Sequence, residues 1–247
     1  MNQRLDRIDL LRALAMLWMT LFHFSFDLDH AGLIQQDFYR DPFWTAQRTA
    51  IVSVFLFTAG LSQAVALHQG QGWPRFWKRW AQVAGAALLV TAGSMFMFPK
   101  SFIYFGVLHG IALMLIVVRL TAGCGGWLWP LGALAIAAKF AAPALIAAMP
   151  ALEVLNTPWL NWLGLISRLP ITEDYVPLLP WLGVMWWGVA AGQWALRHRP
   201  QWLGSADAPA TGVKVWLVTL GRWSLSYYLL HQPVLIGLVT AFVWLRS

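Results

Sequence analysis

A stripe of ionisable side chains lies within the first apolar segment of the chain, residues 8–28. Residues in an α-helix advance by about 100° each, which places His23 at roughly 20° and both Asp9 and Asp27 at roughly 60° from Arg12 around the helix. The opposite face holds Leu, Phe, Ala and Trp side chains. Ionisable groups are costly inside a membrane and usually face a protein interior or a water-filled cavity, so the stripe marks functional candidates.

His23 and Asp27 form the part of this stripe that is best suited to chemistry. They are four residues apart, a spacing at which two side chains meet on one face of a helix. A carboxylate beside an imidazole fixes its tautomer and raises its basicity, as a general base requires. A histidine in this position also suits an acyl-accepting nucleophile, and a structural hydrogen bond between helices is the alternative without chemistry. We expect His23 and Asp27 to be the catalytic residues.

The elements that position these residues are membrane helices. Of the 247 residues, 59% are hydrophobic and 11% charged, whereas soluble domains average about 25% charged residues. A bilayer core of about 30 Å needs roughly 20 apolar residues per helix. Seven apolar segments have about this length: 8–28, 44–67, 77–98, 102–119, 127–148, 179–197 and 223–245. They predict an all-α bundle of seven transmembrane helices that forms one domain over residues 1–247. Residues 211–222 predict a short interfacial helix.

Lysine and arginine are concentrated on one side of this predicted bundle, which the positive-inside rule identifies as cytoplasmic. That side holds Arg4, Arg7, Arg75, Lys78, Arg79, Arg119, Arg197, Arg199 and Lys214. We therefore expect a cytoplasmic N-terminus and a multi-pass membrane protein. The same bias explains the net charge of +7 without a nucleic-acid partner. Cys124 is the single cysteine, which excludes an intramolecular disulfide framework and a cysteine-based metal cluster.

Two further candidates lie in other predicted membrane segments, and one of them, His109, lies at a depth comparable to that of His23. His109 is about two turns inside the fourth segment, where a structural hydrogen bond explains it as well as catalysis does. Arg48, in the second segment, needs a counter-ion. Asp27, Asp41 and Asp174 are the available outer acids. We assign Arg48, His109 and Asp174 to an acceptor pocket.

The last segment carries a second polar cluster. Tyr228 and His231 are three residues apart there. Because this segment starts at the cytoplasmic side, we expect the cluster to bind a cytosolic co-substrate and not to touch the atoms that His23 contacts. Arg12 and Arg222 at the membrane boundary would neutralise phosphates, although positive-inside anchoring explains each arginine as well. We assign Arg12, Arg222, Tyr228 and His231 to donor binding.

Seven segments of the chain share their order and spacing with one known family: Arg7–Ala15, His23–Leu28, Asp37–Trp44, Phe55–Gly60, Phe105–His109, Asp174–Trp181 and Leu220–Pro233. Together they resemble the bacterial relatives of heparan-alpha-glucosaminide N-acetyltransferase, part of the wider group of transmembrane acyltransferases. The resemblance implies transfer of an acyl group, usually acetyl from cytosolic acetyl-CoA, to a sugar hydroxyl or amine across the membrane. The catalytic histidine of the wider group corresponds to His23. Members closest to the human enzyme place theirs in the first outer loop, where His30 lies, and both histidines stay candidates.

The resemblance thus implies a multi-pass acyltransferase of the bacterial inner membrane that modifies an envelope glycan or another sugar on the outer side. Its partners would be the lipid bilayer, an acyl-CoA as co-substrate and the sugar acceptor, with no permanently bound cofactor and no metal; a homo-oligomer is left open. A transporter or a proton or sugar channel that uses the same polar residues is the main alternative, although the chain shows no internal repeat. A haem-binding cytochrome with histidine axial ligands is a third reading.

Overall fold

The computed structural model describes residues 5–203 and 212–246, and the regular elements in these ranges are helices joined by turns and loops. Its one β-type pairing there is an isolated parallel bridge between Phe105 and Tyr175. The predicted all-α class is therefore confirmed. Arg4, one of the predicted cytoplasmic cations, lies outside the described residues.

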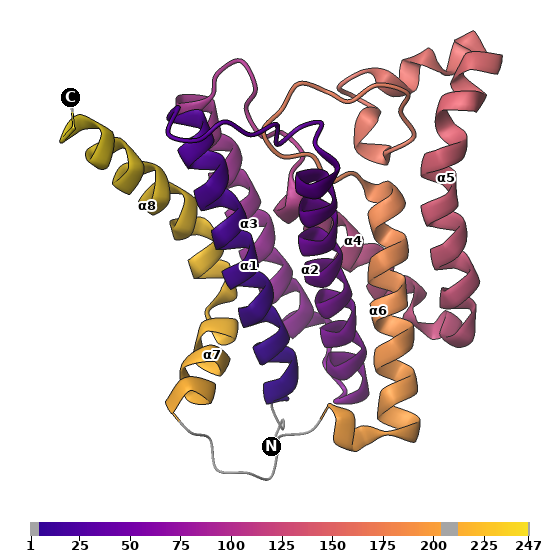
Figure 1. Ribbon diagram of the computed structural model, residues 1–247. Coiled ribbons are helices and arrows are strands. Elements are labelled where there is room, and N and C mark those ends of the chain that lie inside the picture. The colour runs from indigo at the N-terminus through magenta and orange to yellow at the C-terminus, as the bar shows by residue number, and fades with distance from the viewer. Residues whose placement is uncertain (1–4, 204–211, 247) are drawn as a thin grey trace. The chain divides into compact units, whose positions relative to one another are not determined.

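Each of the seven predicted apolar segments forms a helix, and the predicted interfacial segment forms another (Figure 1). The α-helices of the described residues are α1 (Asp6–His30), α2 (Pro42–His68), α3 (Trp73–Met97), α4 (Val107–Thr121), α5 (Leu128–Ala148), α6 (Leu178–His198), α7 (Gly212–Arg222) and α8 (Ser224–Trp244). Short 3-10 helices are η1 (Ala122–Trp127), η2 (Pro150–Asn156), η3 (Asn161–Leu163) and η4 (Pro200–Trp202).

Five helical stretches of the described chain are long and apolar enough to cross a membrane. They are α1, α2, α3, α8 and the stretch Val107–Ala148, in which α4, η1 and α5 follow one another with a kink at Gly125. The helix α6 forms where predicted but is not among these five. The structure thus supports a multi-pass membrane protein, while the count of seven spans and the cytoplasmic N-terminus stay predictions.

The chain divides into two compact units. The terminal unit comprises Met1–Phe55 and Gln201–Ser247 and so contains α1, the first half of α2, α7 and α8. The central unit, Leu56–Pro200, contains the second half of α2 and the helices α3 to α6. Whether residues 1–247 act as one functional domain stays a prediction.

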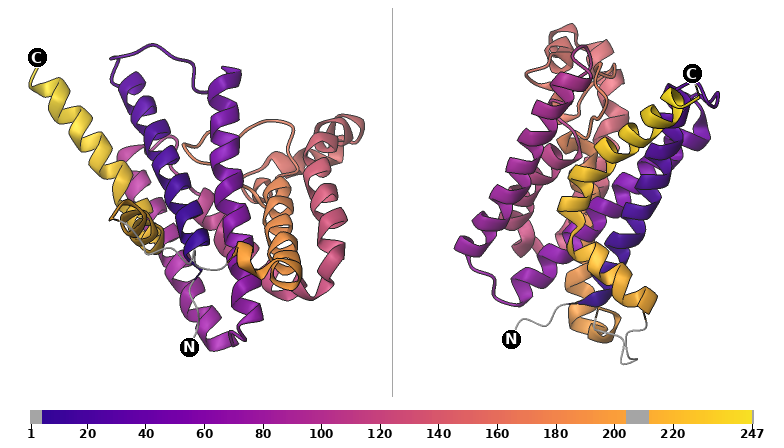
Figure 2. Two further views of the ribbon diagram at one scale, coloured as in Figure 1. Left: turned by 60° about the horizontal axis from the view of Figure 1, so that its bottom comes forward. Right: turned by 90° about the vertical axis from the view of Figure 1, so that its left-hand side faces the viewer.

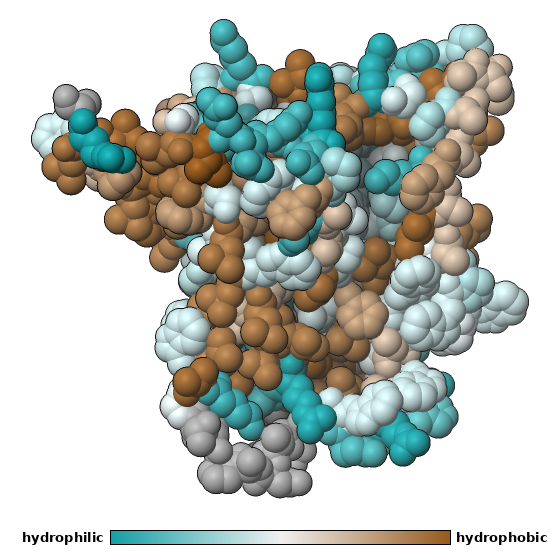
Figure 3. Space-filling model, viewed as in Figure 1, coloured by the Kyte–Doolittle hydropathy of each residue, from teal (hydrophilic) through white to brown (hydrophobic). Residues whose placement is uncertain are grey.

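In the terminal unit, α7 and α8 both pack against α1 (Figure 2). Met16, Met19 and Ile51 are buried in its core, and Tyr227 and Tyr228 of α8 pack against them. Exposed apolar side chains cover much of the rest of α8 (Figure 3) and include Leu230, Val234, Leu238 and Phe242. One side of α8 therefore packs in the protein core, while the other side is apolar and exposed, as expected of a lipid-facing surface.

Ion pairs join α7 to the first turns of α1. Arg222 donates to Asp6 at 3.1 Å, and its Nε lies 3.7 Å from Asp9 Oδ2. Arg12 donates to Asp9 at 2.5 Å. Gly221 allows this close approach because a Cβ at that position would collide with the backbone of Asp9. The pairs and the glycine together fix α7 against α1 and thereby the start of α8.

We expect Gly221→Ala to lower the free energy of unfolding by about 1–3 kcal/mol, the cost of overpacking a tight contact. Thermal unfolding in detergent, followed by tryptophan fluorescence, measures the change. Gly237→Ala is the matched control, since a Cβ at Gly237 in α8 meets no atom within 4 Å and alanine favours a helix. Equal stability of Gly221→Ala and wild type would show that the contact between α1 and α7 is not tight.

The central unit is held by polar contacts between its helices as well as by apolar packing. The indole of Trp186 in α6 donates to Thr121 Oγ1 in α4 at 2.9 Å, and Gln193 donates to the carbonyl of Ala122 at 2.8 Å. Near the other end of α4, the amide of Val176 donates to the carbonyl of Phe105 at 3.1 Å. These contacts fix both ends of α4, the helix that carries His109.

Candidate active site

Helices α1 and α8 bring His23, Asp27 and Gln232 together in the terminal unit. His23 Nδ1 lies 2.5 Å from Gln232 Oε1, and Gln232 Nε2 donates to Asp27 Oδ1 at 2.8 Å. His23 and Asp27 share the predicted face of α1, but no hydrogen bond joins them directly among the described atoms. The side chain of Gln232 lies between them. In place of the expected direct contact, a relay of two hydrogen bonds joins His23, Gln232 and Asp27.

The hydrogen-bonding capacity of these groups determines where the protons lie. An ionised carboxylate only accepts, so the amide NH₂ of Gln232 faces Asp27 and its carbonyl oxygen faces His23. That oxygen also only accepts, so the ring hydrogen of His23 is on Nδ1. The neutral imidazole therefore keeps a lone pair on Nε2, and this atom has no hydrogen-bond partner among the described residues. Because Asp27 is only 7% exposed, its contact with Gln232 is sheltered from water.

Gln232 is the site residue that the sequence analysis missed. Its position between His231 and Pro233, at the end of a polar cluster within an apolar helix, is the one signal for it in the sequence. A lone amide in such a helix is unremarkable until the register between α1 and α8 is known. That register depends on the packing of both helices.

His231 lies beside His23, with the two ring centroids 5.1 Å apart and 47° between the ring planes. The expectation that the last-helix cluster lies away from His23 is wrong, because α8 packs along α1 with His231 and Gln232 at the level of His23. Assignment of His231 and Tyr228 to donor binding stays a prediction. Tyr228 contributes its carbonyl oxygen, which accepts from His231 Nδ1 at 2.7 Å.

A second polar contact joins the two helices one turn away from His23. Thr20 Oγ1 donates to the carbonyl of Met16 at 2.8 Å and lies 2.7 Å from the hydroxyl of Tyr227. Because the hydroxyl hydrogen of Thr20 is used in the first bond, Tyr227 donates in the second. The ring of Tyr227 stacks on His231, with 4° between the ring planes. This contact helps to set the register that places Gln232 opposite His23.

The two arginines assigned to donor binding are both engaged by acids of α1. Arg12 pairs with Asp9, and Arg222 pairs with Asp6 and Asp9. A bound phosphate would compete with these carboxylates for the guanidinium donors. The structure accounts for both arginines as links within the terminal unit, and their role in donor binding stays a prediction.

Arg48, assigned to the acceptor pocket, is exposed on α2. In the described part of the terminal unit, neither Asp27 nor Asp41 forms the expected ion pair with it. Asp41 instead accepts a hydrogen bond from the amide of Phe43 at 2.8 Å, in the first turn of α2. Asp41, one of the three acids considered as a partner of Arg48, thus caps the N-terminus of α2.

His30, the other candidate histidine, is the last residue of α1. Its ring is exposed and stacks on Phe26, with 14° between the ring planes. No described residue hydrogen-bonds to either nitrogen of this ring. Nothing in the described structure therefore selects one tautomer of His30, in contrast to His23.

His109 has both ring nitrogens occupied within the central unit. Thr91 Oγ1 donates to the carbonyl of Ile103 at 2.7 Å, so it accepts from His109 Nε2 at 3.0 Å. The other nitrogen, Nδ1, accepts from the amide of Gly106 at 3.3 Å. The bonds assign the Nε2–H tautomer, which leaves no ring lone pair for a substrate. This geometry explains His109 as a structural residue, and a role in acceptor binding stays a prediction.

Asp174 caps the start of α4. Its Oδ2 accepts from the amide of Val107 at 2.7 Å, where a carboxylate is favoured by the unpaired amides of a helix N-terminus. A Cβ at Gly106 would collide with the carboxylate of Asp174 and would displace it from the amide of Val107. The assignment of Asp174 to the acceptor pocket stays a prediction beside this structural role.

The loop that leads to Asp174 is anchored by two half-buried phenols. The hydroxyl of Tyr175 donates to the carbonyl of Asn161 at 2.5 Å, and Asn161 Nδ2 donates to the hydroxyl of Tyr104 at 2.7 Å. Burial raises the pKa of both Tyr104 and Tyr175 above the ordinary value for a phenol. Both groups therefore stay protonated and act as hydrogen-bonding anchors at neutral pH.

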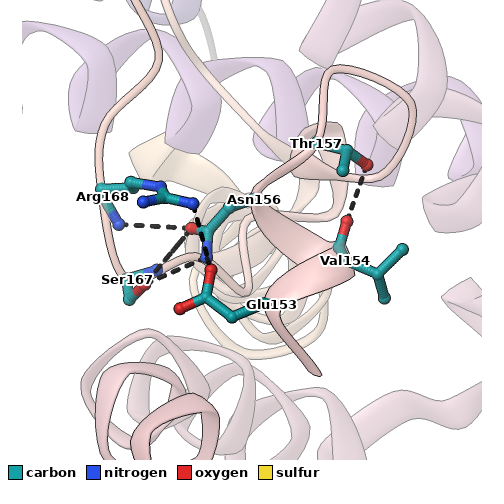
Figure 4. Close-up of polar contacts among 6 residues, drawn as sticks. All are labelled: Glu153, Val154, Asn156, Thr157, Ser167 and Arg168. Carbon is teal, nitrogen blue, oxygen red and sulfur yellow. Dashed lines mark hydrogen bonds and ion pairs between the residues drawn. The ribbon is translucent and has the colours of Figure 1, made fainter. Parts of the chain in front are cut away.

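The same segment is folded on itself upstream of Tyr175 (Figure 4). Arg168 pairs with Glu153 at 3.1 Å, and Asn156 Oδ1 accepts from the amide of Ser167 at 3.0 Å. These contacts close the chain between residues 153 and 168 into a compact loop of the central unit. The long segment between α5 and α6 thus has a defined conformation of its own.

The family comparison covers almost the entire chain. A family model described as heparan-alpha-glucosaminide N-acetyltransferase, catalytic, matches residues 4–233. The match contains the relay of His23, Gln232 and Asp27 together with every other residue assigned above to donor or acceptor binding. No curated protein and no solved structure matches the chain.

Proposed function

Because the chain belongs to the heparan-alpha-glucosaminide N-acetyltransferase catalytic family, we propose that it transfers an acyl group from cytosolic acyl-CoA to a sugar. The acyl group is acetyl, and the acceptor is a hydroxyl or amine of an envelope glycan on the outer side of the bacterial inner membrane. Acyl-CoA is a co-substrate in this reaction, and the bilayer and the glycan are the other partners.

The observation that carries this proposal is the relay from Asp27 through Gln232 to His23. The relay leaves His23 Nε2 with an open lone pair, which is what a general base for acyl transfer needs. His23 Nε2 takes the proton of the acceptor hydroxyl or amine, whose oxygen or nitrogen attacks the thioester carbonyl. The tetrahedral intermediate collapses, the carbon–sulfur bond breaks, and the CoA thiolate leaves.

The relay also supports the charge that develops on His23 during this step. When Nε2 takes a proton, the imidazolium keeps its Nδ1–H bond to Gln232 Oε1. The negative charge of Asp27 polarises the amide of Gln232 and so stabilises the cation across one neutral group. Asp27 is therefore a positioning and electrostatic residue that acts through Gln232.

The same lone pair suits direct attack on the thioester, which would give an acyl-imidazole intermediate. The two routes differ in their kinetics. An acyl-imidazole predicts ping-pong kinetics and release of CoA before the acceptor binds, whereas general-base catalysis requires both substrates together. Initial rates over a grid of donor and acceptor concentrations separate the routes.

The test of the proposed function uses the whole protein in proteoliposomes. Acetyl-CoA labelled in its acetyl group is supplied on one side, and amino sugars or hydroxyl-bearing oligosaccharides are supplied on the other. We expect labelled acetyl-sugar to form in step with free CoA. Sugar flux without consumption of acetyl-CoA would contradict the proposal and favour a transporter that uses the same polar residues.

A further inference from the structure

His231 is a buried histidine that the proposed reaction does not yet use. It is 7% exposed, and its Nε2 is buried without a hydrogen-bond partner among the described residues. A buried polar atom without a partner costs free energy. Such an atom next to a catalytic base is therefore expected to meet a partner at some stage of the reaction.

The contacts of His231 determine which of its nitrogens is available. Its Nδ1 lies 2.7 Å from the carbonyl oxygen of Tyr228, which only accepts, so the ring hydrogen is on Nδ1. The lone pair is then on Nε2, as it is in His23. The stacked ring of Tyr227 and the tilted ring of Tyr228 hold the imidazole in place, with ring centroids 5.9 and 5.6 Å away.

The charged groups near the two imidazoles bear on a proton that passes between them. The ionisable groups next to the rings are Asp27, which acts through Gln232, and the phenols of Tyr227 and Tyr228. Among the described residues, no Lys or Arg forms a hydrogen bond or a cation–π contact with either ring. The Asp27 carboxylate is therefore the charged group that a proton in transit between these rings would face.

We propose that His231 is the proton donor to the leaving thiolate, which it protonates with the proton that His23 takes from the acceptor. His23 Nε2 first gains the acceptor proton, and His231 Nε2 then receives it, which restores neutral His23 in its Nδ1–H form. As the carbon–sulfur bond breaks, the proton passes from His231 to the sulfur and CoA leaves as the thiol. This inference rests on the proposed function and adds a second histidine to it.

His231→Gln tests this step, because glutamine retains a hydrogen-bond donor for the Tyr228 carbonyl but does not exchange protons. We expect turnover with acetyl-CoA to fall by about 10²-fold or more, the usual contribution of a general acid. An S-aryl thioacetate is the second donor, since an aryl thiolate leaves without being protonated. With that donor, we expect the variant to come within a few fold of wild type.

Gln232→Leu is the matched comparison, because it affects the base and should reduce turnover of both donors. An equal loss of His231→Gln with the two donors would indicate a merely structural residue and overturn the inference. Unchanged turnover of acetyl-CoA would overturn it as well. If the wild type transfers no acetyl group at all, the proposed function itself fails, so the two failures are distinguishable.

A measurement on the wild type alone covers the case in which His231→Gln does not fold. A series of thioacetates with thiols of increasing acidity is compared at saturating acceptor. Protonation of the leaving sulfur makes turnover depend only weakly on thiol acidity, which is the result expected. A steep rise in turnover with thiol acidity would show that the sulfur leaves unprotonated and would contradict the role of His231.

Discussion

Replacing His23 by alanine is expected to lower kcat/KM for acetyl transfer by about 10²–10⁴-fold, the range that a positioned general base contributes. The expectation follows from the open Nε2 lone pair of His23 and from the relay that holds its ring. The measurement is transfer of labelled acetyl from acetyl-CoA to a sugar acceptor in proteoliposomes. Turnover is normalised to folded protein by size-exclusion chromatography and thermal unfolding.

His30→Ala is the matched control for this substitution. It removes a histidine from the same helix, but one that is exposed and stacked on Phe26 without a hydrogen bond to a described residue. We expect it to keep turnover close to that of wild type. Wild-type turnover of His23→Ala, or a large loss confined to His30→Ala, would transfer the catalytic role away from His23.

The second large effect is expected at Gln232. Gln232→Leu removes the amide that joins Asp27 to His23, so the imidazole loses its preferred tautomer and the buried Asp27 loses its hydrogen-bond donor. Residues that orient a metal-binding histidine contribute about 10–100-fold, and we apply the same range to Gln232. We expect kcat to fall by this factor while KM for acetyl-CoA changes little.

A double-mutant cycle separates the relay from a local packing effect. If Asp27 acts through Gln232, then Asp27→Asn combined with Gln232→Leu costs no more than Gln232→Leu alone. Additive losses would mean that the two residues act independently. Gln47→Leu is the control, since Gln47 accepts a hydrogen bond from Trp18 of α1 at 2.6 Å but does not contact the relay. It is expected to keep wild-type turnover.

The helices were predictable from the sequence because apolar runs of membrane-spanning length allow little else. The first segment, predicted over residues 8–28, forms α1 over Asp6–His30, and the predicted interfacial segment forms α7 over Gly212–Arg222. Helical periodicity also placed His23 and Asp27 correctly on one face of α1. These features depend only on the spacing of residues close together in the chain, so they can be predicted from the sequence.

The contacts of the site depend on how distant segments pack, which the local pattern of a single sequence does not specify. The register of α8 along α1 decides that Gln232 and not Asp27 contacts His23, and that His231 lies beside it. The bridge between Phe105 and Tyr175 likewise brings Asp174 to the first turn of α4. A single sequence does not distinguish a carboxylate that caps a helix from one that binds a substrate, because both are polar residues beside an apolar segment.

The most direct test of the relay is ¹⁵N NMR of the protein labelled at its histidine rings, in detergent or nanodiscs at neutral pH. The difference between the spectra of wild type and His23→Gln isolates the signals of His23. The relay predicts a protonated Nδ1 and an unprotonated Nε2 for this ring, and Gln232→Leu should abolish that preference. A proton on Nε2 of His23 in the wild type would contradict the account, because the base would then lack its lone pair.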